Sequence, residues 1–130
     1  MVIRPLSSSI CFIQAMVVAI MLAITLSVAP AAAQTQAQTD EALARLAEIL
    51  GALSHLEVVC DEPTRSRQDM EALLASEELT NVRQSVLIDA FNRGFRGVAT
   101  THQRCTASSE RLIERHHERG ASIVASLLDE

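Results

Sequence analysis

The histidines near the C-terminus are the residues whose type and spacing come closest to those of a metal-binding or pH-sensing site. His116 and His117 are adjacent in "ERHHER", and Glu114 with His117 forms Glu-x-x-His, the spacing found in di-iron helical bundles. Those bundles carry the motif on two helices and add a carboxylate from each of the others, whereas this chain has it once. We therefore expect no metal site and no cofactor. His116 and His117 remain candidates for pH sensing, because a histidine near a core becomes charged as the pH falls toward about 6.

The cysteines offer a second kind of chemistry. Cys11 lies in the N-terminal apolar segment, and Cys60 and Cys105 lie beyond it. An even number of cysteines in a small exported chain indicates a disulfide, so we expect a Cys60–Cys105 bridge; the alternative is two unpaired buried thiols. The bridge would stabilise the fold by about 4 kcal/mol through chain entropy. With no Cys-x-x-Cys, phosphate-binding loop or nucleophile signature, the sequence predicts that the protein is not an enzyme.

The N-terminal segment predicts export. Arg4 precedes a long apolar run, and the small residues Ala31 and Ala33 satisfy the requirement of a signal peptidase. We expect a signal peptide over residues 1–33, cleavage after Ala33, a periplasmic location and no stable membrane insertion after cleavage. The alternative is an uncleaved anchor, because about 20 apolar residues can span a bilayer.

The charge of the remaining chain restricts its partners. Beyond Ala33 it carries all sixteen acidic residues and ten arginines but no lysine, an excess of six negative charges with histidine neutral. This balance argues against nonspecific binding to nucleic acid, which depends on cationic contacts to phosphate. A periplasmic or envelope protein is the partner we expect, and the sequence leaves the oligomeric state open.

Helical periodicity runs through most of the chain that follows. After a polar, flexible lead over residues 34–39, apolar residues recur at three- and four-residue steps through a single helical domain over residues 40–130. Pro63 and the polar segment near Thr80 separate the predicted helices. Their expected ranges are 40–60, 66–76, 81–104 and 108 to the C-terminus, with a capping box at Ser66-x-x-Asp69 and an N-cap at Thr80. The predicted fold is all-α, a small antiparallel bundle of about four helices with one disulfide, which places Cys60 and Cys105 at the same end.

The stretch "AFNRGFRG" predicts a close helix contact. Gly94 and Gly97 each cost about 1 kcal/mol relative to alanine inside a helix. The plainest compensation is close approach by another backbone, with Phe91 and Phe95 filling space on either side. A kink or a ligand contact at the glycines is the alternative.

Three arginines form the candidate partner surface. Arg93, Arg96 and Arg104 are expected to make a basic strip on an otherwise acidic protein, with Arg93 paired to Asp89 one turn back. An acidic partner or a lipid headgroup could bind there. The alternative is an ordinary solvated helix face.

Together these features resemble a family of small exported helical proteins of alphaproteobacteria, described only as conserved hypothetical proteins. The resemblance rests on the signal peptide, on "EALARLAEILGALSHL" with a cysteine near the end of that helix, and on "FNRGFRG" followed by Cys. That family more often has tyrosine at the position of Phe95 and an aromatic residue at that of His102. The resemblance implies no activity, so the sequence predicts a non-catalytic binding or structural accessory of the cell envelope. An acid-responsive periplasmic chaperone and a metal-binding helical bundle are the alternatives.

Overall fold

Four helices form the part of the chain that the computed structural model describes, residues 31–75 and 79–129. They are α2 (Ala31–Val59), α3 (Arg65–Leu74), α4 (Asn81–Ala99) and α5 (Ala107–Leu128). The described residues contain no strand, and none of their helices is long and apolar enough to cross a membrane. The predicted all-α class is confirmed. The predicted signal peptide, residues 1–33, lies outside the described residues except for its last three.

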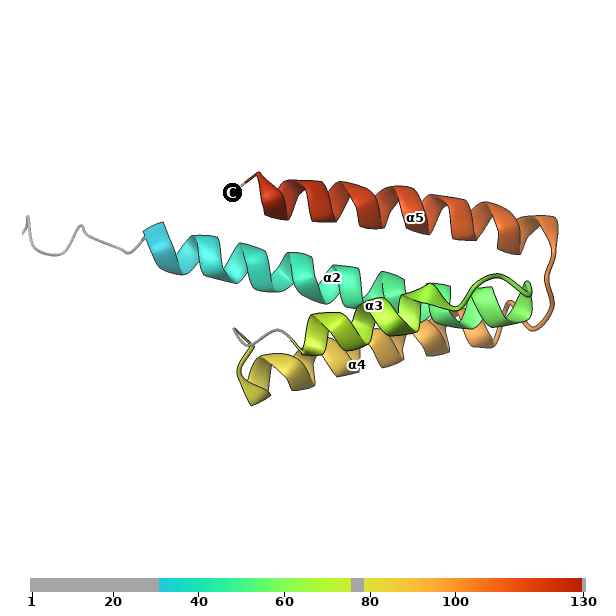
Figure 1. Ribbon diagram of the computed structural model, residues 1–130, viewed down its shortest axis with the longest axis horizontal. Helices are drawn as coiled ribbons and strands as arrows, with labels where there is room; N and C mark the ends of the chain where they lie inside the picture. The colour runs from blue at the N-terminus through green and yellow to red at the C-terminus, as the bar shows by residue number, and fades with distance from the viewer. Residues whose placement is uncertain (1–30, 76–78, 130) are drawn as a thin grey trace, which may run out of the picture. The chain divides into compact units, whose positions relative to one another are not determined.

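The helices pack within one compact unit, Thr35–Glu130, in which α2 is central. Figure 1 shows α2 between α5 on one side and α3 with α4 on the other. Consecutive helices run in opposite directions, so α2 and α4 are parallel and end close together (Figure 1). The Cys60–Cys105 disulfide joins these two ends, with 4.8 Å between the Cα atoms. The predicted antiparallel topology and bridge are both confirmed; we call the end that carries Cys60 and Cys105 the disulfide pole.

The start of α2 differs from the expectation. Residues 34–39, predicted to be a flexible lead, are helical and continue into the predicted first helix. Gln36 Nε2 donates to Asp40 Oδ1 at 3.2 Å, and Thr39 Oγ1 donates to the carbonyl oxygen of Thr35 at 3.0 Å. Alanine and glutamine have favourable helix propensities, so a helix already held by packing farther along extends readily through this polar segment.

The end of α2 is closed by the backbone. The amide of Glu62 donates to the carbonyl oxygen of Glu57 at 2.8 Å, and that of Asp61 donates to Val58 at 3.4 Å. Asp61 has φ 55° in the left-handed region. This pattern is a Schellman motif, which satisfies carbonyl groups that the helix end leaves without partners, with aspartate in the place that glycine usually takes.

The start of α3 is held by a side chain from α2. Thr64 is the N-cap but makes no side-chain capping bond, and the predicted cap, Ser66, lies inside the helix and is buried. The carboxylate of Glu57, only 3% exposed, accepts from the Ser66 amide at 3.3 Å and from its hydroxyl at 2.5 Å. The predicted capping box is therefore wrong. A carboxylate on the neighbouring helix takes the place of a local cap because α3 begins directly against α2.

The last two helices begin at threonine caps. Thr80 Oγ1 accepts from the amide of Arg83 at 3.4 Å, as predicted, and Thr106 Oγ1 accepts from that of Ser109 at 3.2 Å. However, α4 ends at Ala99, well before the predicted end at Arg104. The chain leaves the helix there, and the following loop brings Cys105 to Cys60.

The main core lies among α2, α3 and α4. Its buried apolar residues are Ala47, Leu50, Met70, Leu87 and Ala90, with half-buried leucines and Phe91 around them. Helix α5 is packed more lightly, because its buried residues are the small Ser109 and Gly120. Two of its apolar residues, Val124 and Leu128, are 40% and 80% exposed. Helix α5 is thus a fourth helix laid on α2 rather than part of the main core.

Candidate functional site

Two glycines let α2 and α4 cross with their backbones in contact. A Cβ atom on Gly94 would lie 1.8 Å from the carbonyl oxygen of Glu48, and one on Gly51 would lie 1.9 Å from that of Phe91. The arrangement is reciprocal, since each glycine faces the carbonyl that precedes the other glycine by three residues. Neither position can hold a side chain without moving a backbone. We did not predict a role for Gly51 from the sequence. Like Gly94, however, it is a glycine inside a long helix, where glycine lowers helix stability, so a close contact could have been inferred there as well.

The other residues of the predicted contact have different surroundings. A Cβ atom on Gly97 would meet nothing within 4 Å, so close packing does not explain this glycine. Phe91 packs half-buried against the main core. Phe95 makes an edge-to-face contact with the ring of His55, with centroids 5.2 Å apart. Of the two glycines, therefore, Gly94 lies in the backbone contact, whereas Gly97 faces open space.

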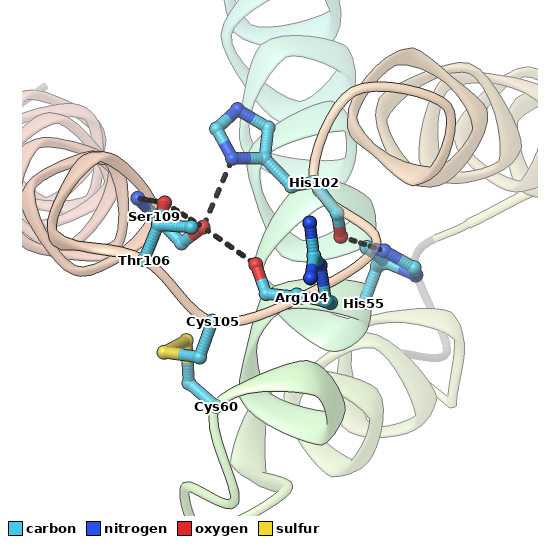
Figure 2. The surroundings of a disulfide bond; sticks show 7 residues. All are labelled: His55, Cys60, His102, Arg104, Cys105, Thr106 and Ser109. Carbon is cyan, nitrogen blue, oxygen red and sulfur yellow. Dashed lines mark hydrogen bonds between the residues drawn. A yellow bond between two sulfur atoms is a disulfide. The ribbon is translucent and has the colours of Figure 1, made fainter.

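The disulfide pole is closed by a hydrogen-bond network (Figure 2). His55 Nε2 lies 2.9 Å from the carbonyl oxygen of His102, and His102 Nδ1 lies 3.0 Å from Ser109 Oγ. The Ser109 hydroxyl also donates to the carbonyl oxygen of Arg104 at 3.3 Å. Ser109 is fully buried, and these bonds satisfy it. With the adjacent Cys60–Cys105 bridge, they tie the loop before α5 to the end of α2.

A groove opens where the pole network ends, between α4 and α5 with α2 as its floor. Its volume is about 670 Å³. Its lining combines apolar or small residues with charged or titratable side chains, and each of the three helices contributes both kinds. The lining residues are Arg45, Glu48, Ile49 and Ala52 of α2; Arg93, Gly94, Gly97 and Val98 of α4; and His116, Arg119 and Ile123 of α5. We call this hollow the α4–α5 groove, and it is the candidate functional site.

A second hollow runs along the opposite side of α5. It has a volume of about 440 Å³ and lies between α5 and α3, again over α2. Its α5 lining includes His116, His117 and Gly120. Gly120 marks where α5 approaches α2, because a Cβ atom there would lie 3.7 Å from Ile49 and 3.8 Å from Leu46. Helix α5 therefore rests on α2 with open space on both flanks.

The predicted basic strip is not formed as expected. Arg93 pairs with Glu48 of α2, with nitrogen and oxygen 3.8 Å apart, rather than with Asp89. Arg96 is exposed and does not line the groove, and Arg104 lies in the loop beyond α4. Because α4 ends at Ala99, the three predicted arginines cannot share one helix face. The arginines that the fold does bring to one hollow are Arg45, Arg93 and Arg119, and two of these were missed.

The missed arginines could not be recognised from spacing. Arg45 and Arg119 lie far apart in the sequence, on helices whose relative rotation the periodicity alone does not define. Arg45 forms an ion pair with Glu41 on its own helix. Arg119 has no ion pair or hydrogen bond with any described residue. The groove is thus lined by three arginines and one carboxylate, Glu48, and Arg119 is the one of these arginines without an ion pair among the described residues, on a protein whose net charge is −5.

The two candidate pH sensors lie in different surroundings. His116 is half-buried between the two hollows, whereas His117 is exposed. Burial lowers the pKa of His116 below 6.5, and the positive charges of Arg119, Arg115 and His117 lower it further. The charged or titratable residues of the two hollows that surround it are Arg45, Glu48, Arg65, Asp69, Arg93, His117 and Arg119.

Glu48 and His116 are the titratable acid–base side chains among the groove's lining residues. This lining contains no cysteine, serine or lysine that could act as a nucleophile. In the part of the chain that the structure describes, no group of three or more histidine, cysteine or acidic residues is placed to hold a metal ion. Glu114 and His117 therefore have the Glu-x-x-His spacing on one helix but belong to no group of three potential metal ligands among the described residues. An apolar hollow with a few converging charged groups is the form that small-molecule sites commonly take.

Comparison with protein families gave one match. Residues 39–130 match a family described as "Protein of unknown function (DUF2385)". No curated protein and no solved structure matches the chain. The match covers all of α3, α4 and α5 and most of α2, and so includes the disulfide and the groove.

Proposed function

The chain belongs to this family of proteins of unknown function, and we propose that it is an exported, non-catalytic binding protein of the cell envelope. The observation that carries the proposal is the α4–α5 groove. It combines apolar and small lining residues with charged ones, and it is large enough for a small ligand. The protein would act by holding a molecule there, with α2 and α4 as a rigid base and α5 as the movable wall.

Two further features support export to an oxidising compartment. The N-terminal segment has the charge, apolar run and small residues of a signal peptide, and the residues before Thr39 lie outside the family match. The Cys60–Cys105 disulfide is of the kind that persists in exported proteins and is rare in reducing compartments. A domain of this size gains much of its stability from such a bridge.

The experiment is intact mass spectrometry of protein isolated from a periplasmic fraction, with and without thiol alkylation under non-reducing conditions. A chain beginning at Gln34 that resists alkylation would support export, cleavage and disulfide formation together. A full-length chain in the membrane fraction with alkylatable thiols at Cys60 and Cys105 would overturn the proposal. A cytoplasmic cysteine-free marker protein, followed in the same fractions, controls for leakage.

A second candidate function is an acid-responsive periplasmic chaperone. The observation in its favour is the half-buried His116 on a helix with open space on both flanks. Its protonation in acid would weaken the contact between α5 and α2 and expose apolar surface. The measurement is protection of an acid-denatured client protein against aggregation on transfer to acidic buffer. Protection that His116→Gln abolishes would favour this function, and no protection by the wild-type protein would exclude it.

A further inference from the structure

On α2 and α4, the lining of the α4–α5 groove differs between its two ends. Helices α2 and α4 both run toward the disulfide pole, and on each the groove's charged residues precede its small or apolar ones. On α2, Arg45 and Glu48 come before Ala52, and on α4, Arg93 comes before Gly97 and Val98. On these two helices the charged lining residues therefore lie away from the disulfide pole, and the small or apolar ones lie nearer to it.

Helix α5 lines the groove in a different order. It runs away from the disulfide pole, so its half-buried His116 lies nearer that pole than Arg119 does, and its apolar Ile123 lies beyond Arg119. The contact of Gly120 with Ile49 and Leu46 sets Arg119 at about the level of Glu48 on α2. Three arginines from three helices thus line the groove together with one carboxylate, Glu48.

One of the three arginines keeps an unpaired charge. Arg119 has no partner among the described residues, while Arg45 pairs with Glu41 and Arg93 pairs with Glu48, both of which are exposed. An anionic group from outside would meet arginines that already converge.

The part of the groove nearer the disulfide pole contains space that no side chain uses. Gly97 weakens helix α4, yet a Cβ atom there would meet nothing within 4 Å, in contrast to Gly94, where the backbone contact requires glycine. The absence of a side chain at Gly97 keeps the groove open between Ala52 and Val98. Close packing therefore does not account for the glycine at this position.

From this distribution of charged and apolar residues, and resting on the proposed binding function, we propose that the α4–α5 groove binds a free medium-chain fatty acid. The carboxylate lies among Arg119, Arg93 and Arg45, and the acyl chain runs over Ala52 and Gly97 toward Val98. From Arg45 to Ala52 the floor is about 10 Å long at 1.5 Å per residue, so it holds the carboxyl-proximal part of a medium chain while the last carbons of a dodecanoate chain project past Ala52. The helical backbone of floor and walls has its amide and carbonyl groups already bonded, so it offers no ladder to an extended peptide, whereas an acyl chain needs none.

The test is isothermal titration calorimetry of the disulfide-bonded protein with dodecanoate below its micelle concentration. Arg119→Gln should weaken binding about tenfold, the effect of removing one hydrogen-bonded charge partner, while Arg111→Gln on the exposed surface of the same helix should not. Gly97→Leu should abolish binding without lowering the melting temperature, because its side chain enters the groove. 1-Dodecanol, which lacks the charge, should bind at least tenfold more weakly than dodecanoate.

Amide chemical shifts give an independent readout. Dodecanoate should shift Gly97, Val98 and Arg119 but leave Val82, which is 75% exposed far from the groove, unchanged. Failure of wild-type protein to bind dodecanoate, or wild-type affinity in either Arg119→Gln or Gly97→Leu, would overturn the fatty-acid proposal. A wild-type dimer that Gly97→Leu converts to a monomer would also overturn it, by showing that a second copy occupies the groove. A protein that is exported but does not bind dodecanoate would contradict only this inference, whereas one that binds dodecanoate but is not exported would contradict the proposed function.

Discussion

The glycine contact between α2 and α4 makes the sharpest stability prediction. In Gly94→Ala the new methyl group would lie 1.8 Å from the carbonyl oxygen of Glu48, whereas ordinary contact begins at 3.4 Å, so the two helices must separate by about 1.6 Å. A gap of even 1 Å forfeits up to about half of the dispersion energy across a contact. Overpacking costs about 1–3 kcal/mol, and a backbone carbonyl cannot relieve it by changing rotamer, so we expect about 3 kcal/mol.

The net effect is smaller because alanine favours the helix by about 1 kcal/mol over glycine. Gly94→Ala should therefore lower the free energy of unfolding by about 2 kcal/mol and the melting temperature by about 8–16 °C. The assay is thermal and denaturant unfolding followed by circular dichroism with the disulfide intact.

The matched control is Gly97→Ala on the same helix. Because a Cβ atom there meets nothing within 4 Å, the variant should gain the helix propensity alone, up to about 1 kcal/mol, and melt about 4–8 °C higher than the wild type. Equal stability of Gly94→Ala and Gly97→Ala would refute the close crossing, since only the crossing distinguishes the two positions.

Three further perturbations test other parts of the structure. Cys105→Ser should lower the free energy of unfolding by about 4 kcal/mol, because the bridge spans 45 residues of sequence; a denaturant midpoint unchanged from that of the oxidised wild type would contradict this. Ser66→Ala should lower it by about 2 kcal/mol, because Glu57 then loses a hydroxyl donor in a site that is 3% exposed; urea unfolding measures the loss, and no change would mean that the bond is not formed. The pKa of His116 is lower in the folded than in the unfolded chain, so the unfolded state binds the proton first and stability should decline as the pH falls below 6.5. That decline should be reduced in His116→Gln but kept in the exposed His117→Gln, as measured by melting temperature from neutral to mildly acidic pH, and identical pH profiles for the two variants would contradict it.

The helices and their ends could be predicted from the sequence because they depend on interactions between residues that are close together in the chain. Apolar residues at three- and four-residue steps determine that the chain is helical, Pro63 places the break after the first helix, and Thr80 caps α4 as predicted. The Cys60–Cys105 pairing also followed, because only two cysteines lie beyond the N-terminal segment and an antiparallel order of helices brings both to one pole.

Tertiary structure alone decided the features that depend on how the helices are rotated and spaced. Ser66 has the spacing of a cap, yet packing against α2 buries it beneath Glu57. Gly94 and Gly97 look alike in the sequence, and only the position of α2 makes one of them obligatory and leaves the other facing a groove.

The candidate site likewise depends on how the helices pack, which the sequence pattern does not define. Sequence periodicity defines which residues share a face of one helix, but it carries no information on which faces of different helices meet. Arg45, Arg93 and Arg119 are far apart in the chain and converge only because α4 and α5 lie on either side of one stretch of α2. The sequence by itself therefore determined the helices, their order and the disulfide, and it carries the prediction of export, whereas the groove and its lining residues are products of three-helix packing.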